Sequence, residues 1–232
     1  MNDIPISERL KAVASLITPT HTLADIGSDH AYLPCYAFLE GRIKKGIAGE
    51  INVGPYRSAL STIEKYGLSE HITARLGDGL SVIEKDEADC ITIAGMGGEL
   101  IRRILEAGKD RLTDATRLIL QPNVGEHQVR LWLMANDFTI DQEMILEEDG
   151  HIYEIIQAQK NDQPKTYSAK ELMFGPILLQ EKSDIFLKKW RAELKKRERV
   201  WQSLGQAVPS PEIAKRRFAI EKEIQWINEV TT

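Results

Sequence analysis

The sequence has little cysteine and no long apolar run. Its two cysteines, Cys35 and Cys90, form no Cys-x-x-Cys or Cys/His pattern among the 232 residues, so neither a disulfide framework nor a metal site is predicted. No stretch approaches the roughly 18 consecutive apolar residues that a membrane span needs, and the N-terminus carries no apolar signal core. With 42% hydrophobic and 28% charged residues, the chain is predicted to be globular and cytoplasmic, with both cysteines in its core.

Positive charge is scarce in the first two thirds of the chain. Residues 1–159 hold 15 Lys and Arg against 25 Asp and Glu, a net charge of −10, whereas residues 160–232 hold 15 against 10, a net charge of +5; the two sum to −5. A polyanionic partner would be held by the basic residues 160–232 and not by the electrostatic field of the protein as a whole, whose net charge is negative. A polar segment at residues 161–165 has the composition of a linker, which predicts domains 1–160 and 161–232. The oligomeric state is left open, and a monomer is compatible with the sequence.

Apolar segments of strand length alternate with amphipathic segments of helix length. Strands are predicted near residues 22–27, 45–50, 72–76, 89–94 and 116–121, and helices near residues 7–17, 31–40, 55–66, 98–106 and 124–135. Two further apolar runs, residues 138–147 and 151–159, are joined by an acidic turn with a glycine, which is typical of a hairpin. Five βα units followed by a hairpin predict an α/β fold with a seven-stranded sheet whose last strand is antiparallel.

The C-terminal part is predicted to be helical. Two long stretches, residues 169–204 and 211–230, are separated by a segment that contains a glycine and two prolines, and we expect them to pack as an antiparallel, coiled-coil-like pair. The dipeptide Gly175-Pro176 is expected to kink or delay the first helix. That stretch carries a run of cations, which is either a solvated helix face or a surface for phosphates. The candidates for contact with RNA are Lys188, Lys189, Arg191 and Lys195.

Residues 23–34 combine a buried strand with a tight polar turn. Asp25 lies at the carboxyl end of the strand, the chain is predicted to reverse at Gly27, and a helix is expected to begin near Ala31. Open α/β sheets bind nucleotides at this point, where the glycine allows close approach and the helix offers free N–H groups. Asp29 and His30 replace the further glycines of a dinucleotide motif, which weakens the prediction of a dinucleotide ligand. The alternative is an ordinary turn in which Asp caps the helix.

The second and third strands each end in an acidic residue. Glu50 follows the first motif by about 20 residues, where a carboxylate is placed to accept hydrogen bonds from ribose hydroxyls. Asp78 stands between two glycines, the second of which is Gly79, so its carboxylate is a candidate acceptor for the exocyclic amine of an adenine. Asp is also a preferred helix cap, and both roles can hold together.

The fourth and fifth strands end in glycines and amides. Gly95 and Met96 belong to a Gly-Met-Gly-Gly segment, which is expected to form a thin wall along a cofactor or a flat base, or merely a structural turn. The fifth strand ends in Gln121-Pro122-Asn123. These amides either read the edge of a nucleobase or cap the next helix.

Taken in order, the motifs resemble the bacterial TrmK family. They are ADIGSDHAYLPCY (24–36), IAGEI with GP (47–55), GDGL (77–80), ITIAGMGGELI (91–101), LILQPN (118–123) and ILEEDGHIYEI (145–155). Members of this family are S-adenosylmethionine-dependent tRNA (adenine(22)-N1)-methyltransferases. The resemblance covers the predicted sheet domain and is weaker in the C-terminal helices. It implies a Rossmann-like class I methyltransferase fold with a helical extension.

The resemblance also implies a cofactor, a substrate and a set of site residues. S-adenosylmethionine would be bound, without a metal, by Asp25, Gly27, Asp29, His30, Glu50, Asp78, Gly79, Gly95 and Met96. The substrate would be a folded tRNA modified in its D arm, which the C-terminal helices would help to hold.

The implied reaction needs no strong general base, because adenine N1 has an in-plane lone pair and is unprotonated at neutral pH. Alignment of the reactants would supply most of the acceleration, and Asp29 would stabilise the positive charge that develops on the base. His30 and Asn123 are the other catalytic candidates. The target adenine must be swung out of its stack. Tyr32 is either the residue that stacks on it or a core residue, and Gln121 is a second candidate for RNA contact.

Two other classes of function remain open on the sequence. A small-molecule methyltransferase could use the same sheet but would not need a basic helical extension. An adapter could retain the cofactor pocket as a relic and bind a protein through its helices. Fold alone does not decide among the three.

Overall fold

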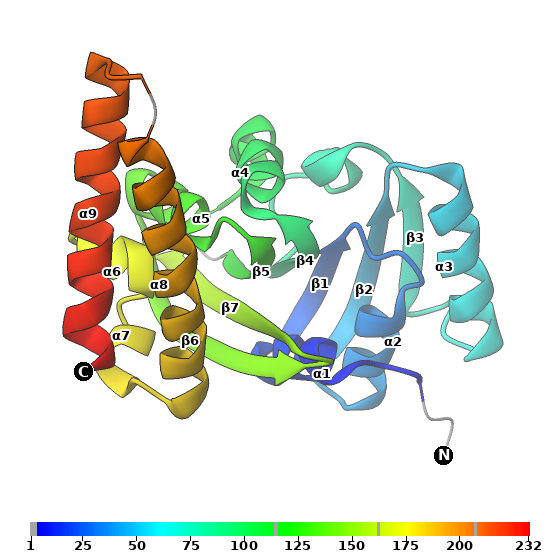
Figure 1. Cartoon of the computed structure of the whole chain (residues 1–232). Helices are drawn as coiled ribbons and strands as arrows, with labels where there is room; N and C mark the ends of the chain where they lie inside the picture. Colours follow the sequence, from blue (N-terminus) through cyan, green and yellow to red (C-terminus); the bar gives the residue numbers. More distant parts are fainter. Residues whose placement is uncertain (1–3, 114–115, 162, 207) are drawn as a thin grey trace.

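A single seven-stranded sheet forms the centre of the computed structural model, which describes residues 4–113, 116–161, 163–206 and 208–232 (Figure 1). The strands are β1 (Thr20–Ile26), β2 (Ile43–Glu50), β3 (Ile72–Leu76), β4 (Cys90–Gly97), β5 (Arg117–Val124), β6 (Phe138–Glu148) and β7 (His151–Lys160). Their order is β3-β2-β1-β4-β5-β7-β6, and β7 is antiparallel to both of its neighbours. The predicted sheet, including its antiparallel last strand, is confirmed.

Helices cover both faces of this sheet, which is why its central strands are apolar on both sides. The helices of the sheet part are α1 (Glu8–Leu16), α2 (Tyr32–Leu39), α3 (Val53–Lys65), α4 (Gly98–Ala107) and α5 (Glu126–Ala135), with short 3-10 turns η1 (Gly79–Val82) and η2 (Lys109–Arg111). Helices α1, α2 and α3 share two apolar clusters, and α4, α5 and η1 share a third. Both cysteines are buried as predicted, and burial raises the pKa of each thiol to about 12.

The strands β4 and β5 are longer than the sequence pattern predicts. The Gly-Met-Gly segment, expected as a loop, continues β4: Met96 pairs with Pro122 and Gly97 pairs with Val124. The register is irregular on both sides of Met96, and an irregular pairing of this kind bends the strand and re-aims its side chains. The ends of β4 and β5 therefore form one continuous wall.

The C-terminal part contains a helix pair, but the predicted helix over residues 169–204 is wrong as a single element. It is divided into α6 (Ala169–Phe174), α7 (Leu178–Glu181) and α8 (Asp184–Gly205). The first break follows from Gly175, whose φ is +88°, and from Pro176 after it. At the second break Ser183 caps α8 by accepting a hydrogen bond from the Phe186 N–H.

The long helices α8 and α9 (Pro211–Thr231) lie side by side beyond the β6 edge of the sheet (Figure 1). This confirms the antiparallel pair. One position of the predicted linker, Asp162, and one of the loop between the two long helices, Ala207, lie outside the described residues. Within the described part of the chain, no helix combines the length and apolar character that a membrane crossing requires.

A buried network of charges joins the helix pair to the sheet. Arg130 of α5, fully buried, donates to Glu143 of β6 at 2.7 Å and to Glu154 of β7 at 2.5 Å, and Lys189 of α8 donates to Glu154 at 2.7 Å. Burial opposes the charge of Glu154, but Arg130 and Lys189 outweigh it and hold its pKa below the ordinary value. Burial dominates at Glu143 and raises its pKa.

The segment after residue 160 contributes to the core of the sheet part. Tyr167 and Leu172 belong to the same apolar cluster as α4 and α5, and the hydroxyl of Tyr167 accepts a hydrogen bond from the Ile140 N–H at 2.9 Å. The division into domains 1–160 and 161–232 stays a prediction. A cut at residue 160 would nevertheless remove part of the core.

We expect Gly175→Ala to destabilise the protein strongly. A Cβ at this position would lie 2.7 Å from both Arg130 Nη2 and Glu143 Oε2, so the substitution must displace a buried ion pair in a closely packed site, at a cost of about 1–3 kcal/mol beyond that of the positive φ. Gly67→Ala is the matched control, because Gly67 also has a positive φ but has nothing within 4 Å of the added atom; it should cost about 1 kcal/mol. Urea denaturation measures both free energies of unfolding. Equal losses would contradict the role given to the ion pair.

Candidate functional site

A cavity of about 430 Å³ opens at the carboxyl ends of β1, β2 and β4. The strand order reverses at β1, which lies between β2 and β4, and ligands of open α/β sheets bind at such a point. The lining residues come from α1, from the start of α2, and from the ends of the three strands with the turns that follow them: Arg9, Leu10, Asp25, Gly27, Ser28, Asp29, His30, Tyr32, Leu33, Glu50, Ile51, Asn52, Ala94, Gly95 and Met96. Most of the predicted cofactor residues are therefore brought together.

Asp25 holds the turn after β1 in shape. Its carboxylate is buried and accepts hydrogen bonds from the Ser28 hydroxyl at 2.5 Å and the Thr92 hydroxyl at 2.6 Å. Burial raises the pKa of Asp25 against the effect of the two hydroxyls. Asp25 thus reaches the cavity wall with both oxygens engaged by the protein, and its predicted contact with a cofactor stays a prediction.

The turn itself is formed by alternating left-handed residues. Gly27, Asp29 and Ala31 have φ values of +72°, +57° and +55°. A Cβ on Gly27 would overlap Met96 Cε, so the glycine lets Met96 close the floor of the cavity. Ala31 precedes α2, which begins at Tyr32, and no side chain from the turn caps this helix. The hypothesis of an Asp that merely caps the helix is therefore wrong.

Glu50 is buried at the end of β2 and links this strand to the turn. Its Oε1 accepts a hydrogen bond from the Asp29 N–H. Burial raises the pKa of Glu50 more than this bond lowers it. Because one carboxylate oxygen has a bond to the backbone, the other is the acceptor that can serve a ligand in the cavity.

Asp29 and His30 stand at the mouth of the cavity. His30 Nε2 lies 3.6 Å from Asp29 Oδ2, and the two side chains are 44% and 70% exposed, so both groups are open to a ligand. The His30 ring stacks on Tyr32, with ring centres 5.2 Å apart and planes at 21°. Tyr32 also packs on the apolar cluster between α2 and α3. Its predicted contact with RNA stays a prediction.

The amides at the end of β5 hold the glycine wall of β4. Gln121 is fully buried, and its Oε1 accepts from the Gly95 N–H at 2.9 Å and from Arg9. Asn123 donates to the Gly95 carbonyl at 2.8 Å and accepts from Gln121 at 3.1 Å. Helix α5 begins after Gly125 without a side-chain cap, so the capping hypothesis for these amides is wrong. Their contacts with substrate stay predictions.

Arg9, Ile51 and Asn52 line the cavity and were not found from the sequence. Arg9 lies on α1, whose first N–H groups, those of Glu8 and Arg9, donate to Glu148 Oε1 at 2.6 and 3.3 Å. No local pattern could indicate this contact, because the partners are about 140 residues apart. Ile51 and Asn52 follow Glu50 directly, and this adjacency to a predicted cofactor residue was the available signal.

Asp78 and Gly79 are not among the residues that line this cavity. They follow β3, which is the neighbour of β2 on the side away from β1. Asp78 stands before the 3-10 turn η1, and its side chain makes no capping hydrogen bond, so the capping role predicted for Asp78 is wrong. The predicted role of both residues in cofactor binding stays a prediction.

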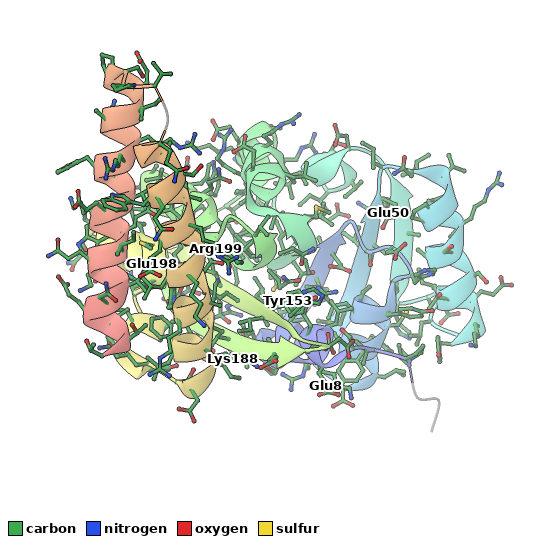
Figure 2. The ribbon with its side chains drawn as sticks, in the orientation of Figure 1. Glu8, Glu50, Tyr153, Lys188, Glu198 and Arg199 are labelled. Atoms are coloured by element: carbon green, nitrogen blue, oxygen red, sulfur yellow. The ribbon has the colours of Figure 1, made fainter. Side chains whose placement is uncertain are left out.

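A larger cavity, of about 730 Å³, opens between the sheet and α8. Asn123 lines this cavity and also holds Gly95, which lines the smaller one. Tyr153 of β7 and Trp190 of α8 are its aromatic lining. Figure 2 shows Tyr153 between α8 and the strand that carries Glu50.

Cations of α8 gather along a shallow hollow on the surface. Its charged lining consists of Asp184, Lys188, Arg191, Lys195, Lys196 and Arg199. Lys188 also pairs with Glu147 at 2.6 Å, and Arg191 donates to the Thr231 carbonyl at 3.3 Å. Lys189 is different: it is 15% exposed and paired with Glu126 and Glu154. Its ammonium group serves the buried charge network, and its predicted contact with RNA stays a prediction.

Comparison with known proteins shows similarity along nearly the whole chain. The family model described as "TrmK: tRNA (adenine(22)-N(1))-methyltransferase" matches residues 23–229. The chain is 46% identical, over 234 aligned positions, to the tRNA (adenine(22)-N(1))-methyltransferase of Bacillus subtilis (strain 168), in an alignment that covers 99% of this chain and 98% of that protein.

Two solved structures are similar over the sheet and the helix pair. The crystal structure of the B. subtilis m1A22 tRNA methyltransferase TrmK matches with a TM-score of 0.94 at 44% identity and covers 99% of this chain and 100% of that one. Streptococcus pneumoniae Sp1610, in complex with S-adenosyl-L-methionine, matches with a TM-score of 0.88 at 43% identity and covers 98% and 100%. The similarity therefore includes the C-terminal helices.

Proposed function

This chain belongs to the TrmK family of tRNA (adenine(22)-N(1))-methyltransferases, and we propose how its residues carry out the reaction of that family. The protein is an enzyme that methylates N1 of adenine 22 in tRNA and depends on S-adenosylmethionine. This cofactor, when bound, supplies a methyl group activated by a sulfonium. The observation that carries the proposal is the 430 Å³ cavity at the point where the strand order reverses.

The residues of this cavity fit the cofactor. Glu50 offers one carboxylate oxygen to ribose hydroxyls, and the exposed side chain of Ile51 offers an apolar surface to the adenine ring. Arg9 brings a positive charge for the carboxylate of the methionine moiety of S-adenosylmethionine. Asp29 and His30 close the mouth, and Met96 forms the floor that only a glycine at residue 27 permits.

Catalysis rests on position and on charge. Adenine N1 needs no deprotonation, so the chain has to hold the base and the methyl group in line. The exposed carboxylate of Asp29 stabilises the positive charge that develops on the base. His30, beside Asp29, orients the base, and Asn123 keeps the Gly95 wall at the distance that the base requires.

The tRNA is held mainly through its phosphates. The cations of the α8 hollow lie on the same side of the molecule as the larger cavity, since Lys196 lines both. Contacts of this kind position an RNA without reading its sequence. A cytoplasmic location, which a tRNA substrate favours, stays a prediction.

The proposed function is tested by incubating the protein with methyl-labelled S-adenosylmethionine and total tRNA. We expect label in tRNAs that carry adenine at position 22, and we expect a transcript with guanine at that position to accept none. Nuclease digestion and mass spectrometry locate the methylated base. Label at another base, or on a small molecule alone, would overturn the assignment.

Glu50→Gln should weaken binding of S-adenosylmethionine by about 10- to 100-fold at neutral pH, because the variant cannot form a charge-assisted hydrogen bond. In the wild type, affinity should fall as the pH is lowered through the pKa of Glu50, which burial raises above 4.5, since protonation removes the negative charge that strengthens the hydrogen bond. The variant should lack that step. Calorimetric titration across pH measures both effects, with exposed Glu64→Gln on α3 as the control. An unchanged affinity in folded Glu50→Gln would remove Glu50 from the cofactor site.

The double variant Lys195→Glu/Arg199→Glu should weaken tRNA binding and leave cofactor affinity unchanged. For each cation that meets a phosphate, its removal should lower the slope of log affinity against log salt by about 1. Lys44→Glu is the control, because this exposed lysine lies at the amino end of β2, away from both cavities. Filter binding at several salt concentrations provides the slopes. Equal slopes for the double variant and the wild type would exclude the α8 hollow from the RNA surface.

A further inference from the structure

We propose that Tyr153 is the platform on which the flipped adenine of the tRNA stacks. The inference rests on the proposed function and adds a substrate-contacting residue to it. Tyr153 is half-buried on β7 and lines the 730 Å³ cavity between the sheet and α8. Its aromatic face thus borders a space large enough for a nucleoside.

Tyr153 contacts Arg9, a residue that lines the cofactor cavity. The guanidinium carbon of Arg9 lies 5.3 Å from the centre of the Tyr153 ring, a cation–π contact. Arg9 itself lines the smaller cavity and donates to Gln121. The ring therefore stands at the boundary between the two cavities, where a base must lie if its N1 is to reach the methyl group.

The larger cavity has the chemistry that a nucleotide requires. A base swung out of its stack recovers free energy on an aromatic face, and its phosphate needs cations or donors. Asn123 lies at the end nearest the cofactor, with its amide held by Gly95 and Gln121. Lys196 and Arg197 line the cavity from ion pairs with Glu193. Trp190, 4% exposed, borders the cavity as a second aromatic side chain.

Tyr32 is less suited to this role, although it lies beside the first turn. Its ring packs against the apolar cluster between α2 and α3. Contact with a neighbouring ring does not separate the two tyrosines, because Tyr32 is stacked on His30 and Tyr153 is tilted against His151 with ring centres 6.3 Å apart. It lines the smaller cavity, which the cofactor occupies, and is not among the residues that line the larger one. Tyr153 therefore offers the platform on the substrate side.

The test compares Tyr153→Phe, Tyr153→Leu and Tyr153→Ala in the full-length protein. Single-turnover methylation of a tRNA transcript is measured at saturating tRNA, with cofactor and tRNA affinities measured separately. The alanine and leucine variants should be slower by about 5- to 150-fold, the range expected when a base-stacking ring is removed. The phenylalanine variant should stay within about threefold, because stacking uses the ring and not the hydroxyl. Tyr66→Ala, at the far end of α3, is the control.

Affinities for S-adenosylmethionine and tRNA should stay within about threefold in all three variants. A leucine variant with the wild-type rate would overturn the proposal, since leucine keeps the apolar bulk but has no aromatic face. A fall in cofactor affinity equal to the fall in rate would also overturn it, because Tyr153 would then act through Arg9. If the alanine variant does not fold, the comparison of the single-turnover rates of the phenylalanine and leucine variants decides. Failure of the proposed function would be recognised separately from failure of the Tyr153 proposal, because the wild-type protein itself would then not methylate adenine 22.

Discussion

The buried charge of Arg130 is the interaction on which the arrangement of the molecule depends. Arg130 lies between Glu143 and Glu154, and Glu154 also accepts from Lys189 of α8. The second oxygen of Glu143 accepts from the N–H of Ile177 at 2.9 Å, at the start of α7. One set of charges thus joins α5, both strands of the hairpin, the turn before α7 and the long helix. Because an unpaired buried charge costs several kcal/mol, these elements must assemble together.

The hairpin formed by β6 and β7 supports both cavities. Glu148 near its tip holds the first turn of α1 and so positions Arg9 at the cofactor cavity. Glu154 holds α8 through Lys189, and α8 forms a wall of the larger cavity. Tyr153 lies between these two carboxylates in sequence and borders the space between the two walls. The antiparallel strand that completes the sheet therefore also sets the distance between the cofactor residues and the helix that meets the RNA.

The cations of α8 are divided between structure and surface. Lys189 is buried in the charge network, whereas Lys195 and Arg199, six and ten positions further along, line an open hollow. A helix whose one face carries a buried ion pair is held rigidly, and a rigid row of cations loses less entropy when it meets phosphates. The same helix can therefore fix the cavity and bind the substrate.

The sequence by itself determined the succession of strands and helices along the chain and the family to which the chain belongs. It also indicated which residues at the ends of β1 and β2 line the cofactor cavity. It could do so because burial imposes a period on each element and the carboxyl ends of parallel strands meet at one edge. Tertiary structure alone decided what those residues touch. Asp25 faces two hydroxyls, Lys189 faces two carboxylates, and Arg9 and Tyr153, which are far apart in the sequence, are in contact at the site. A periodic pattern records that a side chain is buried, but the partner that satisfies a buried charge can lie more than 100 residues away, and only the folded chain brings the two together.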